Sequence, residues 1–270
     1  RTFILYAWLC MAFAEEDGEE MERCYVMDNC AEIRNLSISF SKRAAVSNIS
    51  LDIPHDGITV LLRRSGSGKT TLLRALNRLN ETFEGYEQSG SVKVCLDGLM
   101  DDIYTLPSHS LTFIRRKVGM VCQVPNPLPM SMRRNMILPM SLVLKLGKKE
   151  AAARMEKALT EVGLWDEVKD RLDSSAMAFS GGQQQRMCLA RTLALEPDLL
   201  LLDEPTASLD RKSSELIEDH LLSLKGKYPM IMVSHSLSQA IKLGDRFIIM
   251  SDGCVKKIIE KENLQHKDAE

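Results

Sequence analysis

The stretch VLLRRSGSGKTTLLRALNR, residues 60–78, constrains the fold more than any other part of the chain. An apolar run suited to a strand buried on both faces leads into a glycine-rich turn, and apolar positions at helical spacing follow. Backbone N–H groups of such a turn form a concave site for phosphate. The pattern predicts a loop for ATP and Mg²⁺, in which Lys69 reaches the β/γ-phosphates and the Thr70 hydroxyl ligates the metal. The predicted nucleotide contacts are Arg63, Arg64, Ser65, Gly66, Ser67, Gly68, Lys69, Thr70 and Thr71.

One position departs from the pattern G-x-x-x-x-G-K-[ST], because Arg63 stands where the first glycine belongs and Arg64 follows it. The donors that wrap the phosphates come mainly from residues 66–71, which are all present. A left-handed backbone at Arg63 would cost about 1–2 kcal/mol, roughly a tenfold loss of affinity. Two added cations beside the triphosphate would offset part of that loss. We expect weakened ATP binding, and a nucleotide-binding module impaired by Arg63 stays an alternative.

The run LLLLDEP, residues 199–205, ends a second buried strand in two acids. The carboxyl end of this strand would place Asp203 beside the phosphate loop, where it would hold the Mg²⁺ shell. Glu204 would orient and deprotonate an attacking water. Together with the phosphate loop, the two acids predict ATP hydrolysis.

A third motif, FSGGQQQRMCLARTLA at residues 179–194, places Ser180, Gly181 and Gly182 ahead of a helix. An ordinary serine N-cap explains such a start, but one nucleotide does not need two helix N-termini from the same chain. The motif, followed by a strand and DE, resembles the signature of ABC-type ATPases. In that family the signature, here Ser180 to Gln183, closes over the γ-phosphate of ATP held by a second subunit. The resemblance therefore implies a head-to-tail dimer of this chain with two shared sites.

The resemblance assigns roles to four further residues. Gln123 in MVCQVPNPLP matches the glutamine that senses Mg²⁺ and the attacking water and links to a helical lobe. Asp210 in ASLD matches the loop that crosses the dimer interface, and His235 in IMVSH matches the switch histidine at the γ-phosphate. Phe40 falls where the family stacks an aromatic ring on adenine, although an aromatic at a strand end often belongs to the core.

The resemblance covers roughly residues 31–256 and narrows to the ATPase subunit of the bacterial phosphate importer, most specifically through the triple glutamine and the PNPLP loop. It implies docking on two transmembrane permease subunits at the cytoplasmic face of the cell membrane, as a peripheral protein. A periplasmic or extracellular phosphate-binding protein would be an indirect partner. No residue pattern here recognises inorganic phosphate, so the transported substrate rests on the resemblance alone.

The fold class implied by these motifs is an α/β P-loop NTPase of the ABC ATPase type, with a mixed β-sheet core, an antiparallel β subdomain and a helical subdomain. The ATPase domain is expected at residues 31–256, and helical periodicity places the helical subdomain at about residues 124–178. Residues 1–30 are expected to form a leader and acidic linker, and residues 257–270 a charged tail. The apolar run of the leader is too short to span a bilayer, and it resembles a secretory signal. The expectation for the leader is nevertheless a disordered or non-native segment.

Composition bears on a competing class, a soluble ABC ATPase that acts on nucleic acid or ribosomes. The formal net charge is −2, without the basic excess of a nucleic-acid binder. Gln123 and Ser180 are 57 residues apart, which leaves no room for a long coiled-coil insertion. We therefore expect no nucleic-acid partner.

Seven scattered cysteines show no metal-ligand spacing and indicate reduced thiols.

Overall fold

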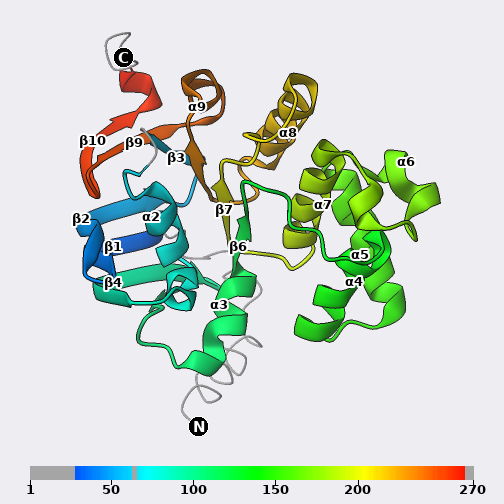
Figure 1. Cartoon of the computed structure of the whole chain (residues 1–270), viewed down its shortest axis with the longest axis horizontal. Coiled ribbons are helices and arrows are strands. Elements are labelled where there is room, and N and C mark those ends of the chain that lie inside the picture. The colour runs from blue at the N-terminus through cyan, green and yellow to red at the C-terminus, as the bar shows by residue number, and fades with distance from the viewer. Residues whose placement is uncertain (1–27, 63–65, 265–270) are drawn as a thin grey trace, which may run out of the picture.

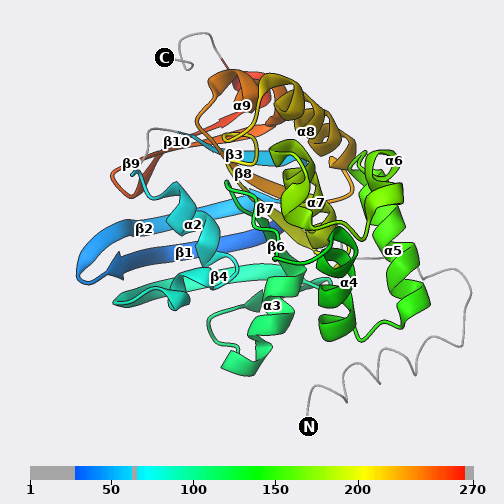
Figure 2. The ribbon, with the colours of Figure 1, turned by 45° about the vertical axis from the view of Figure 1, so that its right-hand side comes forward.

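The computed structural model describes residues 28–62 and 66–264, which form two β-sheets and a set of helices (Figure 1). An antiparallel sheet lies at one side of the molecule, and the helices α4 (Met132–Val143), α5 (Lys148–Glu161) and α6 (Trp165–Val168) lie at the other. The turned view in Figure 2 shows the same separation, with a second, larger sheet between the two. The layers therefore separate a β subdomain, a central sheet and a helical lobe.

The antiparallel sheet has the strand order β2-β1-β4-β5. Its side chains alternate on β1, where Ala31, Ile33, Leu36 and Ile38 are buried and an irregularity between Ile33 and Leu36 shifts the alternation by one residue. The run IRNLSISF at residues 33–40 largely alternates apolar and polar residues, which is typical of a half-buried strand. The strands are β1 (Asn29–Phe40), β2 (Arg43–Pro54), β4 (Tyr86–Leu96) and β5 (Leu99–Asp102).

The central sheet has the order β10-β9-β3-β8-β7-β6, in which β3 and β6 to β9 are parallel and β10 is antiparallel to β9. The carboxyl ends of parallel strands meet at one edge, which is where open α/β sheets bind ligands. Segments far apart in the sequence, after β3, β7 and β8, therefore converge there. The strands are β3 (Ile58–Leu62), β6 (Val118–Val121), β7 (Leu199–Asp203), β8 (Met230–Ser234), β9 (Arg246–Ser251) and β10 (Cys254–Glu260).

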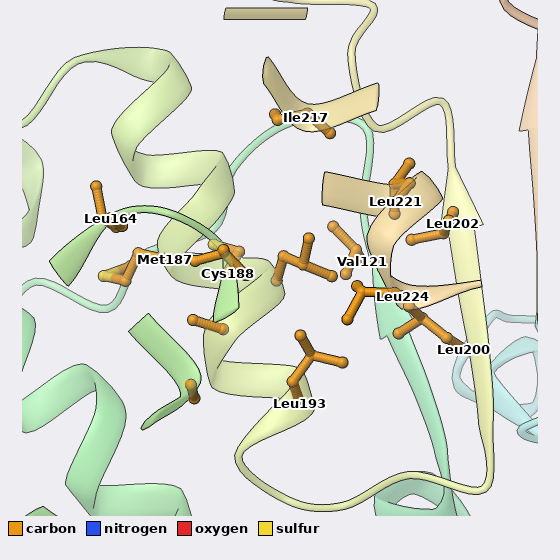
Figure 3. Packing of buried hydrophobic residues seen from close by; sticks show 14 of the residues in the cluster. Val121, Leu164, Met187, Cys188, Leu193, Leu200, Leu202, Ile217, Leu221 and Leu224 are labelled. Carbon is orange, nitrogen blue, oxygen red and sulfur yellow. The ribbon is translucent and has the colours of Figure 1, made fainter. Parts of the chain in front are cut away.

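The remaining helices surround the central sheet. They are α2 (Lys69–Ala75), α3 (Leu111–Lys117), α7 (Gly181–Leu193), α8 (Arg211–Leu224) and α9 (Leu237–Leu243), with short 3₁₀ turns such as η1 (Leu79–Thr82) between elements. Helix α7 carries the residues that anchor the helical lobe to this sheet. Figure 3 shows Met187, Cys188 and Leu193 of α7 in one buried cluster with Leu200 and Leu202 of β7 and with α8.

Two local features differ from the sequence patterns. Helix α2 ends at Ala75, although apolar spacing continues to Leu79, because the Asn77 side chain accepts a hydrogen bond from the Leu79 N–H and Arg78 adopts a φ of 57°. Strand β10 crosses the boundary expected at residue 256, and its Ile259 is buried. Among the described residues, no helix combines the length and apolar character needed to cross a membrane.

Candidate functional site

A cavity of about 200 Å³ opens where β3, β7 and β8 end. The predicted phosphate loop follows β3, Glu204 follows β7, and His235 follows β8, so the parallel register alone brings them together. Arg63, Arg64 and Ser65 lie outside the described residues. The lining residues are Ala45, Gly66, Gly68, Lys69, Thr70, Thr71, Glu204 and His235.

The loop approaches strand β2 so closely that one glycine is required. Gly68 has a φ of 90°, and a Cβ atom there would overlap the carbonyl oxygen of Ala45. Gly68 caps α2, and its carbonyl accepts the hydrogen bond from the Leu72 N–H at 2.9 Å. The first turn of α2, which includes Lys69 and Thr70, is thereby directed along the wall of the cavity.

Lys69 is buried at the start of α2, and its Nζ lies 3.5 Å from the Ser67 hydroxyl oxygen. Burial lowers the pKa of its ammonium, and the carboxylates of Glu204 and Asp203 oppose that shift. A phosphate in the cavity would bring an anion that favours the charged form of Lys69. Lys69 is therefore positioned to bind an anionic ligand.

Asp203 ends β7 as a buried carboxylate with both oxygens engaged. The Thr70 hydroxyl donates to its Oδ1 at 2.9 Å, and Nη2 of Arg74 lies 3.8 Å from its Oδ2. No group of three or more His, Cys, Asp or Glu residues in the described ranges could hold a metal alone. Mg²⁺, however, is commonly bound by one or two protein oxygens plus substrate phosphates. The adjacent hydroxyl of Thr70 and carboxylate of Asp203 fit that ion.

Glu204 faces His235 across the ends of β7 and β8, with its Oε1 2.6 Å from the histidine Nε2. The backbone of Glu204 has a φ of 50°, which is uncommon for a residue other than glycine, and its N–H donates to the Val233 carbonyl at 3.1 Å. Such backbone outliers concentrate at functional sites. The bend directs a single carboxylate toward the cavity beside an imidazole, a pair able to accept a proton.

The predicted signature does not line this cavity. Ser180 caps α7 in a capping box: its Oγ accepts from the Gln183 N–H at 3.3 Å, and its own N–H donates to Gln183 Oε1 at 3.1 Å. Asp210 caps α8 through Ser213, whose hydroxyl and, secondly, N–H lower the pKa of the carboxyl. A Cβ on Gly182 would crowd the Ser213 side chain, so these two caps lie together. Both sequence motifs thus share one surface of the same chain.

Four other predicted site residues are also absent from the cavity lining: Ser67, Asp203, Phe40 and Gln123. Ser67 and Asp203 are buried beside Lys69 and Thr70, which do line it, whereas Phe40 and Gln123 lie elsewhere. The Phe40 ring packs against Phe83 and Tyr86, with centroid distances of 6.0 and 5.9 Å. Gln123 is exposed two residues after β6, level with the end of the neighbouring β7. Their roles toward adenine, Mg²⁺ and water stay predictions.

Three residues at or near these motifs were not predicted. Ala45 lines the cavity, Arg74 approaches Asp203, and Glu167 accepts a hydrogen bond from Gln183. Arg74 stands four residues after Thr70 on one helix, so the spacing could have predicted that the two side chains lie on the same face of the helix. The other two contacts join distant segments and leave no local pattern.

Several known proteins resemble this chain over most of its length. A family model described as ABC transporter matches residues 46–207. Phosphate import ATP-binding protein PstB of Mycobacterium intracellulare is 42% identical over 86% of this chain and 78% of its own. PstB 1 of Nitrosococcus oceani is 40% identical over 92% of this chain and 88% of its own.

Two solved structures extend the comparison. CbiO1 from Clostridium perfringens, part of the ABC transporter complex CbiONQ, has a TM-score of 0.73 at 24% identity, covering 87% of this chain and 90% of its own. The ATP-binding cassette MJ0796, solved as a dimer bound to ADP and Pi, has a TM-score of 0.71 at 28% identity. That match covers 86% of this chain and 98% of the cassette.

Proposed function

The chain belongs to the ABC transporter family, and we propose that it is the ATP-hydrolysing subunit of an importer for inorganic phosphate. The observation that carries this proposal is the gathering of Lys69, Thr70, Glu204 and His235 around one cavity, in a chain whose relatives are phosphate import ATP-binding proteins. The predicted resemblance and the predicted α/β fold class are confirmed. The comparisons give no support to a soluble ATPase that acts on nucleic acid or ribosomes.

The loop binds the triphosphate of ATP through the backbone N–H groups of residues 66–71 and the ammonium of Lys69. Thr70 and Asp203 would hold Mg²⁺, which would neutralise charge on the phosphate oxygens. Glu204 orients a water for attack on the γ-phosphorus and accepts its proton, and His235 holds the Glu204 carboxylate in place. The 2.6 Å approach of His235 to Glu204 supports this division of roles.

A dimer completes each site. The cap of α7 at Ser180 and the cap of α8 at Asp210 lie outside the lining of their own cavity. A head-to-tail arrangement brings the Ser180 cap of one chain to the γ-phosphate in the cavity of the other and places the Asp210 cap at the dimer interface. Phe40 then lies at the adenine and Gln123 near the attacking water. The dimeric state of the related cassette bound to ADP and Pi supports two chains per assembly.

The assembly acts at the cytoplasmic face of the membrane, where each dimer docks on two permease subunits. Supporting this, the relatives are named as phosphate import ATP-binding proteins. Selection of phosphate belongs to the permease and to an external phosphate-binding protein, and of these two only the binding protein couples to the chain indirectly.

Reconstitution tests the proposal. The chain and two permease subunits are placed in proteoliposomes, and ATP hydrolysis is measured with and without phosphate and its binding protein, with Lys69→Ala as the inactive control. We expect phosphate-loaded binding protein to stimulate hydrolysis. Failure to form a membrane complex, or stimulation by RNA or DNA in its place, would refute the importer assignment.

A further inference from the structure

One carboxylate outside the predicted motifs is bound to the signature at the start of α7. Glu167, on the short helix α6, accepts from Nε2 of Gln183 at 2.9 Å through its Oε2. The same carboxylate accepts two hydrogen bonds from the Arg186 guanidinium: Nη1 donates to Oε1 at 2.7 Å, and Nη2 donates to Oε2 at 3.1 Å. Glu167 therefore joins two residues of α7 that lie one turn apart.

The Arg186 side chain makes this contact rigid. Arg186 is buried, and its Nη1 also donates to the Gly163 carbonyl at 2.9 Å, just before α6. A bidentate arginine–carboxylate pair fixes geometry more tightly than a single hydrogen bond. The Arg186 guanidinium and, secondarily, the Gln183 amide hold the pKa of Glu167 below its usual range, so this group is an anion at neutral pH.

The anion decides which way the Gln183 amide points. An ionised carboxylate only accepts hydrogen bonds, so Gln183 must turn its NH₂ toward Glu167. That choice leaves the Gln183 carbonyl oxygen facing the Ser180 N–H, where it accepts at 3.1 Å. The capping box at the start of α7 therefore depends on a residue of α6, 13 positions before Ser180.

We propose that Glu167 is a positioning residue for the signature: through the Gln183 amide it fixes the N-terminus of α7, and so acts on ATP held by the second chain of the dimer. The inference rests on the proposed function, because it assumes that the signature closes over the partner's nucleotide. Its effect is predicted to appear in trans, on the site whose phosphate loop belongs to the other chain.

The sharpest substitution is Glu167→Gln, which keeps the size of the side chain and one acceptor for Arg186. The oxygen of the new amide keeps the shorter contact with Arg186, from Nη1 at 2.7 Å. Its NH₂ then stands where Oε2 accepted from Gln183 and from Nη2 of Arg186, so Gln183 flips and its own NH₂ meets the Ser180 N–H. Glu167→Gln combined with Gln183→Glu restores an acceptor toward both groups, because glutamate at this position also completes a capping box. Asp166→Asn is the matched control, since the neighbouring Asp166 is exposed and pairs with Lys169 at 2.8 Å.

The first measurement is amide hydrogen exchange at Ser180 in the full chain without nucleotide, which is independent of any activity. Loss of the cap should speed exchange about fivefold in Glu167→Gln, with recovery in the double variant and no change in Asp166→Asn. Unchanged exchange in Glu167→Gln, or no recovery in the double variant, would overturn the role of Glu167 in orienting Gln183.

The second measurement separates a trans effect from damage to the variant chain itself. Heterodimers of differently tagged chains carry Lys69→Ala and Glu167→Gln either on the same chain or on opposite chains, and their ATP hydrolysis is compared. With shared sites, opposite chains leave one site with an intact loop and an intact signature, whereas the same-chain arrangement leaves none. We expect lower activity when both substitutions are on the same chain.

The same pair of heterodimers made with Ser180→Arg in place of Glu167→Gln tells the two claims apart. If this control shows the same-chain deficit and Glu167→Gln does not, the positioning role of Glu167 is wrong and the shared site stands. If the control shows no difference between arrangements, the shared-site part of the proposed function is wrong.

Discussion

Gly68 and Gly66 form a natural matched pair for testing how the phosphate loop is built. Both have positive φ, 90° and 83°, so an alanine at either position carries backbone strain of about 1–2 kcal/mol. They differ in surroundings. A Cβ at Gly66 has no neighbour within 4 Å, whereas one at Gly68 would lie closer than 3.0 Å to the Ala45 carbonyl oxygen on β2.

The difference gives two magnitudes. Gly66→Ala carries the strain alone, which corresponds to a loss of ATP affinity of about 5–30-fold. Gly68→Ala adds displacement of the β2 backbone, and overpacking of this kind costs roughly 1–3 kcal/mol more. The sum of about 2–5 kcal/mol predicts a loss of roughly 30-fold to several thousandfold for Gly68→Ala.

A fluorescent ATP analogue titrated in the Glu204→Gln background measures affinity without interference from turnover. Circular dichroism melting curves check that both variants fold. Equal affinities for the two variants, or weaker binding by Gly66→Ala, would show that the approach of the loop to Ala45 does not shape the site.

Three further outcomes are expected. Glu204→Gln should keep ATP binding, slow hydrolysis and trap an ATP-bound dimer on size-exclusion chromatography; normal turnover would remove Glu204 from its assigned role. Because the pKa of Glu167 in the folded chain lies below its ordinary 4.5, the stability it contributes is present above that pH and is lost as the pH falls through the lower value. The melting-temperature gap between the unsubstituted chain and Glu167→Gln should therefore shrink in acid, and a constant gap would contradict the ion pair. Burial raises the pKa of the Cys30 thiol to about 12, so iodoacetamide at pH 8 should label Cys30 only after unfolding, as peptide mass spectrometry would show.

The parts of the site that follow parallel strands were predictable from sequence. Apolar runs ending in SGSGKTT, DE and SH predict strands whose carboxyl ends converge, and the register of β3, β7 and β8 places Lys69, Glu204 and His235 around one cavity. Local pattern is sufficient here because strand direction fixes where each following residue lies.

Contacts between distant segments were not predictable in the same way. Nothing near Glu167 indicates that it binds Gln183, since that contact depends on how α6 packs beside α7. The charges of Lys256 and Lys257 led to the prediction of a charged tail at the C-terminus. These lysines instead belong to β10, an edge strand that continues to Glu260, and lysines are common on edge strands. The placement of Gln123 likewise depends on a loop rather than on a strand end.

The central claim, that this chain hydrolyses ATP at the cavity between β3, β7 and β8, is tested most directly by the turnover of the purified chain beside Glu204→Gln and Arg63→Gly. We predict Mg²⁺-dependent turnover by the unsubstituted chain, its loss in Glu204→Gln, and a gain in ATP affinity of about tenfold at most in Arg63→Gly. Turnover that survives Glu204→Gln, or that occurs only after Arg63→Gly, would contradict the claim.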